Sequence, residues 1–105
     1  MKSLKTFHLV GALKQRLGEQ LRLNAHERNH FSFYLEAPEL VPNDDIKTAI
    51  NAVLKEENHI FDSERHDNIL IFDGEKCLGW VSFSNFSGQE PFLIIVSVFS
   101  TPRKS

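Results

Sequence analysis

Several classes of protein are excluded by what this sequence lacks. The 105 residues include one cysteine, too few for an intrachain disulfide framework or a cysteine-based zinc finger. No apolar run approaches the roughly 18 residues that a membrane-spanning helix needs. The apolar stretch Leu9–Leu13 is too short for the core of a signal peptide, because charge resumes at Lys14. We therefore expect a cytoplasmic protein that is not a membrane protein.

Familiar catalytic and nucleotide-binding motifs are also missing. The sequence contains no phosphate-binding G-x-x-x-x-G-K-[ST], no dinucleotide-binding G-x-G-x-x-G and no nucleophile motif G-x-S-x-G. The net charge of −2 argues against nucleic acid as the main partner. Basic residues do not alternate with aromatic residues as they would on an RNA-binding sheet. We therefore expect a protein that is not an enzyme and needs no cofactor.

The composition is that of a small globular protein. Apolar residues make up 41% of the chain and charged residues 25%, and nine phenylalanines supply bulk for a core. A chain of this length fits one domain and leaves no room for two, so we expect a single domain over residues 1–105.

Two segments have the apolar spacing of amphipathic helices. The first begins near Ser3 and should end between Leu23 and Asn29; its apolar positions are Phe7, Val10, Leu13, Leu17 and Leu21. The second covers residues 44–57, after a start signal in which Asn43 or Asp44 can cap the helix. Its apolar stripe consists of Ile46, Ala49, Ile50, Val53 and Leu54.

Four segments are typical of strands. Residues 31–36 alternate apolar and polar side chains, and Asp73-Gly74 predicts a hairpin between strands at 68–72 and 77–84. In the second of these strands, Cys77, Val81 and Phe83 should share one face, with Leu78 and Trp80 on the other. Residues 92–99 are almost continuously apolar, which favours a central strand. The segment from His59 to Asp67 is either a loop or a short edge strand.

The predicted order is helix, strand, helix and then three strands. Strands that follow one another closely in sequence usually pair as an antiparallel meander. We therefore expect an α+β two-layer sandwich, with two helices packed on a mostly antiparallel sheet of about four strands.

One short pattern resembles a metal site. His26-Glu27-Arg28-Asn29-His30 matches H-E-x-x-H, in which two histidines one helical turn apart bind zinc and the glutamate acts as general base. The match covers five residues, and His30 leads directly into an alternating strand pattern. We therefore interpret these residues as a polar turn at the end of the first helix, and keep a zinc-dependent hydrolase using His26 and His30 as the alternative function.

Charge is distributed unevenly along the chain. Residues 1–35 carry six basic and two acidic side chains, a balance of +4, whereas residues 36–67 carry three basic and nine acidic side chains, a balance of −6. An acidic surface of this kind can steer a basic partner. The acidic positions around the end of the second helix and the segment after it are Glu56, Glu57, Asp62, Glu64 and Asp67.

Our hypothesis from the sequence is a small protein-binding module. In its most concrete form it is an inhibitor or immunity-type protein that neutralises a basic protein, such as a toxin nuclease, through these acidic residues. Tyr34 and Trp80 join the predicted binding residues, because aromatic side chains on a face without helices are candidate hot spots. A homodimer is a further possibility, with the strand at 92–99 or its neighbour pairing across the interface.

Overall fold

The computed structural model describes residues 6–56, 60–62, 68–73, 75–86 and 92–100. Its two helices are α1 (Thr6–Leu21) and α2 (Asn43–Glu56). Its six strands are β1 (Asn24–Asn29), β2 (Ser32–Ala37), β3 (Ile60–Asp62), β4 (Asn68–Asp73), β5 (Lys76–Phe86) and β6 (Phe92–Ser100). Neither helix in this described part is long and apolar enough to cross a membrane.

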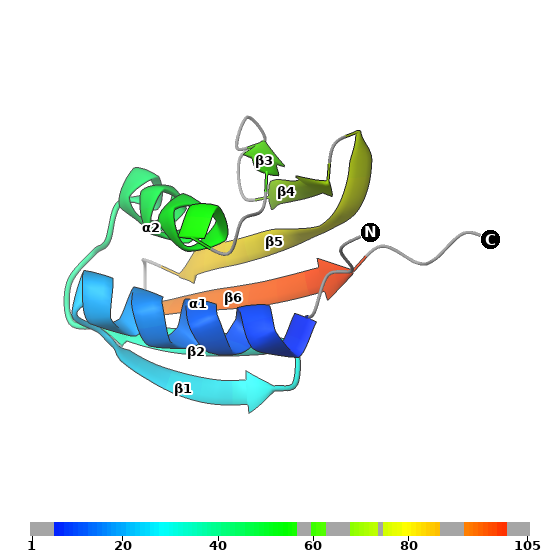
Figure 1. Ribbon diagram of the computed structural model, residues 1–105. Coiled ribbons are helices and arrows are strands. Elements are labelled where there is room, and N and C mark those ends of the chain that lie inside the picture. Colours follow the sequence, from blue (N-terminus) through cyan, green and yellow to red (C-terminus); the bar gives the residue numbers. More distant parts are fainter. Residues whose placement is uncertain (1–5, 57–59, 63–67, 74, 87–91, 101–105) are drawn as a thin grey trace.

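The strands form one antiparallel sheet, and both helices lie on the same face of it (Figure 1). The strand order is β1-β2-β6-β5-β4-β3. The predicted α+β two-layer sandwich is therefore confirmed. The sheet is wider than the sequence indicated, because β1 adds a strand at one edge and the short β3 adds one at the other.

Apolar side chains from both layers meet between the helices and the sheet. The predicted stripe of α2 is buried in full, from Ile46 to Leu54. It packs together with Leu13 and Leu17 of α1 and with alternate residues of the central strands. The strand positions in this core are Phe33, Leu35, Ile69, Ile71, Val81, Phe83, Ile94, Val96 and Val98.

The first helix ends earlier than predicted. Arg22 adopts a left-handed conformation with φ of 56°, and the Leu23 N–H donates to the Gly18 carbonyl at 2.9 Å. These two features are typical of a helix C-terminus. Because α1 stops at Leu21, residues 24–29 are free to pair with β2, and the expected polar turn is instead strand β1.

The β4–β5 hairpin is confirmed, but the predicted faces of its second strand are partly wrong. Ile71 pairs with Gly79, whereas Phe72 pairs with Cys77, so Leu78 is an extra residue opposite this step. Such a bulge reverses the alternation of side chains on one side of it. As a result Leu78 lies in the core, while Cys77 is half-buried with its Sγ 3.5 Å from the Gly79 carbonyl oxygen.

Strand β6 is central, as its apolar sequence predicted, with β2 on one side and β5 on the other. Both of its hydrogen-bonding edges are therefore used within the chain. The same is true of its neighbours β2 and β5. The strand pairing that we considered for a homodimer, at residues 92–99 or the neighbouring strand, would need a strand edge that this sheet does not leave free.

Candidate functional site

The candidate site lies on the face of the sheet opposite the helices. We call this face of the sheet the open face. On β2 the side chains of Phe33 and Leu35 enter the core, so those of Tyr34 and Glu36 point the other way. On β5 the same alternation places Trp80 opposite to Val81. The two aromatic residues predicted to bind a partner, Tyr34 and Trp80, therefore share the open face.

Strand register arranges the open face in rows that run across the strands. The tyrosine row consists of His26, Tyr34, Ile95 and Ser84, which are opposite one another on β1, β2, β6 and β5. The rings of His26 and Tyr34 stack with their centroids 4.9 Å apart. This row therefore presents a broad apolar and aromatic surface at its β1 end.

The next row is made of small polar side chains. The serine row consists of Ser32, Ser97 and Ser82 on β2, β6 and β5, in direct register. At its β1 end, Arg28 Nη1 donates to Ser32 Oγ at 3.3 Å. Because serine is much smaller than tyrosine or isoleucine, the serine row lies lower than the tyrosine row at Ser97 and Ser82, whereas Ser32 is buried.

Two outer rows are apolar except at the β1 end of the first, where Glu36 lies. The glutamate row consists of Glu36, Leu93 and Phe86, and the tryptophan row consists of Phe99, Trp80 and Leu70. Trp80 and Phe99 stack with ring centroids 5.1 Å apart. Phe86 is 51% exposed and Phe99 42% exposed, so the outer rows present large apolar side chains to solvent.

Charged groups gather at the β1 end of the open face, around a shallow pocket. The pocket has a volume of about 400 Å³ and is lined by Arg28, Tyr34, Glu36, Leu93 and Ile95. Glu36 Oε1 lies 2.8 Å from His26 Nε2, out of line for a hydrogen bond, so the contact is an ion pair only when the imidazole is protonated. The pocket thus has an apolar floor with a cation and an anion at its rim.

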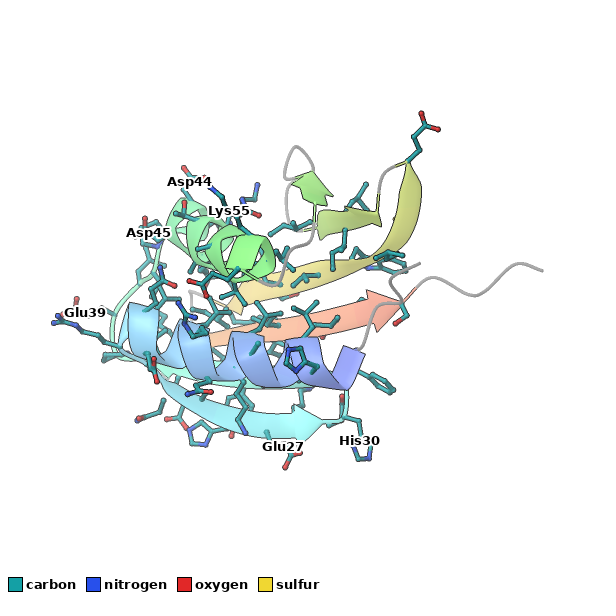
Figure 2. All side chains as sticks on the ribbon, viewed as in Figure 1. Glu27, His30, Glu39, Asp44, Asp45 and Lys55 are labelled. Atoms are coloured by element: carbon teal, nitrogen blue, oxygen red, sulfur yellow. The ribbon has the colours of Figure 1, made fainter. Side chains whose placement is uncertain are left out.

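The H-E-x-x-H residues do not form the helical zinc-binding pattern. They occupy β1 and the turn after it, so His26 lies on the open face beside Tyr34 while Glu27 points to the opposite face. Figure 2 shows Glu27 and His30 at the β1 side of the molecule. Within the described residues, no three histidine, cysteine, aspartate or glutamate side chains gather as a metal-binding group.

The predicted acidic surface is described only in part. Glu56 is exposed at the end of α2, where the Arg16 guanidinium of α1 holds it through two hydrogen bonds, one of them 2.8 Å from Nη2 to Oε1. Asp62 ends the edge strand β3. Glu57, Glu64 and Asp67 lie outside the described residues.

A different acidic group lies at the other end of α2. Glu39, Asp44 and Asp45 are exposed, and Figure 2 shows them at the same end of the molecule. Asp44 and Asp45 belong to the first turn of α2, where negative charge stabilises the positive end of the helix dipole. Their position is therefore explained by the helix itself.

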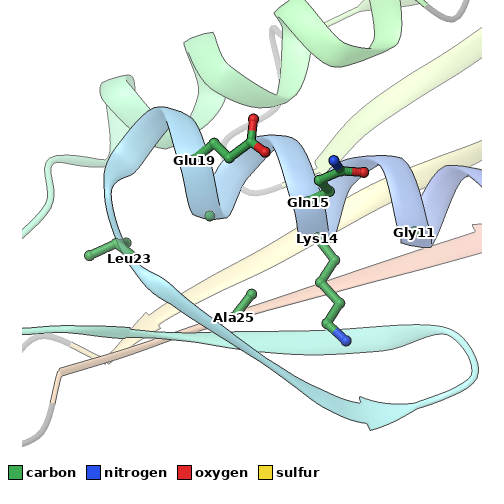
Figure 3. A pocket seen from close by; sticks show the side chains of 7 residues that line it. Gly11, Lys14, Gln15, Glu19, Leu23 and Ala25 are labelled. Carbon is green, nitrogen blue, oxygen red and sulfur yellow. The ribbon is translucent and has the colours of Figure 1, made fainter.

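A second hollow lies between α1 and β1 (Figure 3). It has a volume of about 560 Å³, and Lys14 reaches from α1 toward β1 along it. On the helix side the lining includes Gly11 and Gly18, which have no side chains to fill the space. On the strand side the lining residues are Leu23 and Ala25. Its charged groups do not converge on one point, so we place the candidate site on the open face.

Sequence reasoning found Tyr34 and Trp80 but missed the rest of the open face. The open-face positions of Ile95 and Leu93 could not be predicted, because residues 92–99 are almost continuously apolar. Such a run does not distinguish the two faces of a strand. Comparison with known proteins adds no assignment: no family model matches the chain, and no curated protein or solved structure matches it significantly.

Proposed function

We propose that this chain is a non-enzymatic protein-binding module that binds its partner through the open face. The observation that carries the proposal is the set of aromatic and aliphatic side chains on the face that neither helix covers. Contiguous exposed apolar surface on a small protein is typical of an interaction site. Aromatic residues such as Tyr34 and Trp80 are also the side chains that most often dominate binding energy.

A more specific version of the proposal is an inhibitor or immunity-type protein with a basic partner, such as a toxin nuclease. Support for it comes from the balance of −6 over residues 36–67. Surface carboxylates of this kind accelerate association with a basic protein through long-range attraction. Glu56 contributes less than its charge suggests, because Arg16 already neutralises it.

The zinc-hydrolase alternative has no comparable support. General-base catalysis on a zinc-bound water needs the glutamate and both histidines directed at one centre. In β1, Glu27 and His26 lie on opposite faces of the strand.

Site-directed photocrosslinking in cells tests the binding module. Ser84 is exposed on the open face, so a photoreactive residue at position 84 should give discrete protein adducts after irradiation. A photoreactive residue in place of Gln20, which is exposed on α1, is the matched control and should give none. Adding Ile95→Asp to the Ser84 probe should remove the adducts, because a carboxylate then interrupts the apolar surface.

The proposal would be contradicted by adducts that form from position 20 and not from position 84. It would also be contradicted by adducts at position 84 that persist unchanged with Ile95→Asp. Circular dichroism of each variant should show the spectrum of the parent, so that a loss of adducts reports on binding rather than on unfolding.

A further inference from the structure

We propose that the partner of the open face is a second copy of this chain, packed face to face about a two-fold axis that runs across the strands. This inference rests on the proposed function and names the partner of that same site. Two sheets pack in this way about 10 Å apart, with their strands approximately aligned. The axis lies between the tyrosine row and the serine row.

This symmetry pairs large side chains with small ones. Rotation about the axis exchanges the tyrosine and serine rows, so Tyr34 and Ile95 of one copy lie over Ser32 and Ser97 of the other. Ile95 therefore enters the low serine row at Ser97, whereas Tyr34 lies over Ser32, which is buried within its own chain and hydrogen-bonded to Arg28. Close packing of this kind is what stable interfaces share with protein interiors.

The outer rows are exchanged by the same rotation. Leu93 of the glutamate row then lies over Phe99 of the second copy, and Phe86 lies over Trp80. The two most exposed phenylalanines of the open face, Phe86 and Phe99, are thereby both covered. The arrangement removes from water the apolar surface that the single chain leaves exposed.

Charge complementarity supports the same orientation. The rotation brings Arg28 level with His26 of the second copy, whose Nε2 lies 2.8 Å from the Glu36 carboxylate. Rows are about 7 Å apart, a distance that an arginine side chain spans. The hydrogen bond of Arg28 to Ser32 uses one of five guanidinium N–H donors, so others can reach this carboxylate.

The edges of the sheet are poorly suited to association. Edge strand β1 carries Glu27 and Arg28 and has an irregular register between Glu27 and Asn29, and edge strand β3 has three residues. Charges, bulges and short length all protect an edge strand from pairing with another chain.

A face-to-face interface of ordinary size buries about 800 Å² of each partner. This area is about a ninth of the 6950 Å² surface of this chain.

Sedimentation velocity of the full-length protein over a range of concentrations tests the inference. The wild type should form dimers with a dissociation constant in about the micromolar range or tighter. Arg28→Glu and Glu36→Arg should each weaken the dimer by at least about tenfold, because each creates two like-charge contacts across the axis. Glu39→Arg and Lys55→Glu, which reverse exposed charges away from the open face, should leave the dimer unchanged.

Mixing the two weakened variants gives the sharpest result. In a heterodimer of Arg28→Glu with Glu36→Arg, both charge contacts are again attractive, so the equimolar mixture should dimerise more tightly than either variant alone. The double variant carrying both substitutions should also dimerise, which would show that the two substitutions together are compatible with folding.

A wild type that remains monomeric would overturn the inference, as would a dimer that survives both reversals or a mixture that stays monomeric. The photocrosslinking result separates these failures from failure of the proposed function. A monomer whose position 84 still gives Ile95-dependent adducts with another protein refutes the second copy and retains the binding module. A monomer without such adducts refutes both.

Discussion

Arg22 decides where α1 stops and thereby allows β1 to form. A left-handed conformation costs a non-glycine residue about 1–2 kcal/mol, yet Arg22 adopts it with φ of 56°. The Leu23 N–H then donates to the Gly18 carbonyl, which would otherwise lack a partner at the helix end. One backbone conformation therefore separates a helix from a strand that begins two residues later.

A single substitution at Gly11 should raise the stability of the protein. A Cβ atom added at Gly11 meets nothing within 4 Å, so alanine fits without displacing a neighbour. Gly11→Ala should raise the free energy of unfolding by about 0.5–1 kcal/mol, because alanine loses less backbone entropy in a helix than glycine. Chemical denaturation of the two proteins measures the difference.

Gly18 is the matched control in the same helix. A Cβ atom there lies 3.3 Å from the Leu23 carbonyl oxygen, which belongs to the backbone at the helix end. Gly18→Ala should therefore stabilise the protein less than Gly11→Ala, or destabilise it. The opposite ranking of the two variants would contradict this account of the C-terminal end of α1.

At the scale of elements, α2 is held by its buried stripe and by contacts at both ends. At its start, Asn85 Nδ2 of β5 donates to the Val41 carbonyl at 2.8 Å and to Asn43 Oδ1 at 2.9 Å. At its end, Glu56 pairs with Arg16 of α1. Exposed ion pairs of the latter kind contribute little, about 0–1 kcal/mol, so the apolar stripe provides most of the attachment.

Ile50 lies at the centre of that stripe and has no exposed surface. Ile50→Ala should lower the free energy of unfolding by about 2–5 kcal/mol, because it removes buried methylene groups and leaves a cavity. Lys55→Ala, at an exposed position of the same helix, should change it by less than about 0.5 kcal/mol. Equal losses for the two variants in a denaturant titration would mean that α2 is not attached through its stripe.

At the scale of the whole molecule, the two ends of α2 carry separate acidic groups. A helix of 14 residues is about 21 Å long, whereas charges are screened over about 8 Å at physiological ionic strength. A basic partner attracted to one end is therefore largely insensitive to charge at the other. This separation gives the acidic-surface proposal an internal control.

Charge reversal at Glu57, Asp62, Glu64 and Asp67 should slow association with a basic partner protein, and more so at low salt. Asp44→Lys should leave the association rate unchanged. Stopped-flow or surface-based kinetics at two salt concentrations measures both. Equal rates for the parent and all four reversed variants would contradict a role for these carboxylates in attracting a basic partner.

Periodicity in the sequence by itself predicted the two helices, the strands β2, β4, β5 and β6, and the packing of helices on a sheet. It could do so because the spacing of apolar residues reflects which side of each element meets the core. The sequence also led us to predict Tyr34 and Trp80 as binding residues. Strand β1 was not predicted, since the polar segment Asn24–Asn29 has no apolar alternation and gains its structure from pairing with β2. The rows of the open face were decided by the tertiary structure alone, because cross-strand register joins residues such as Arg28, Ser32 and Ser97 that no local pattern connects.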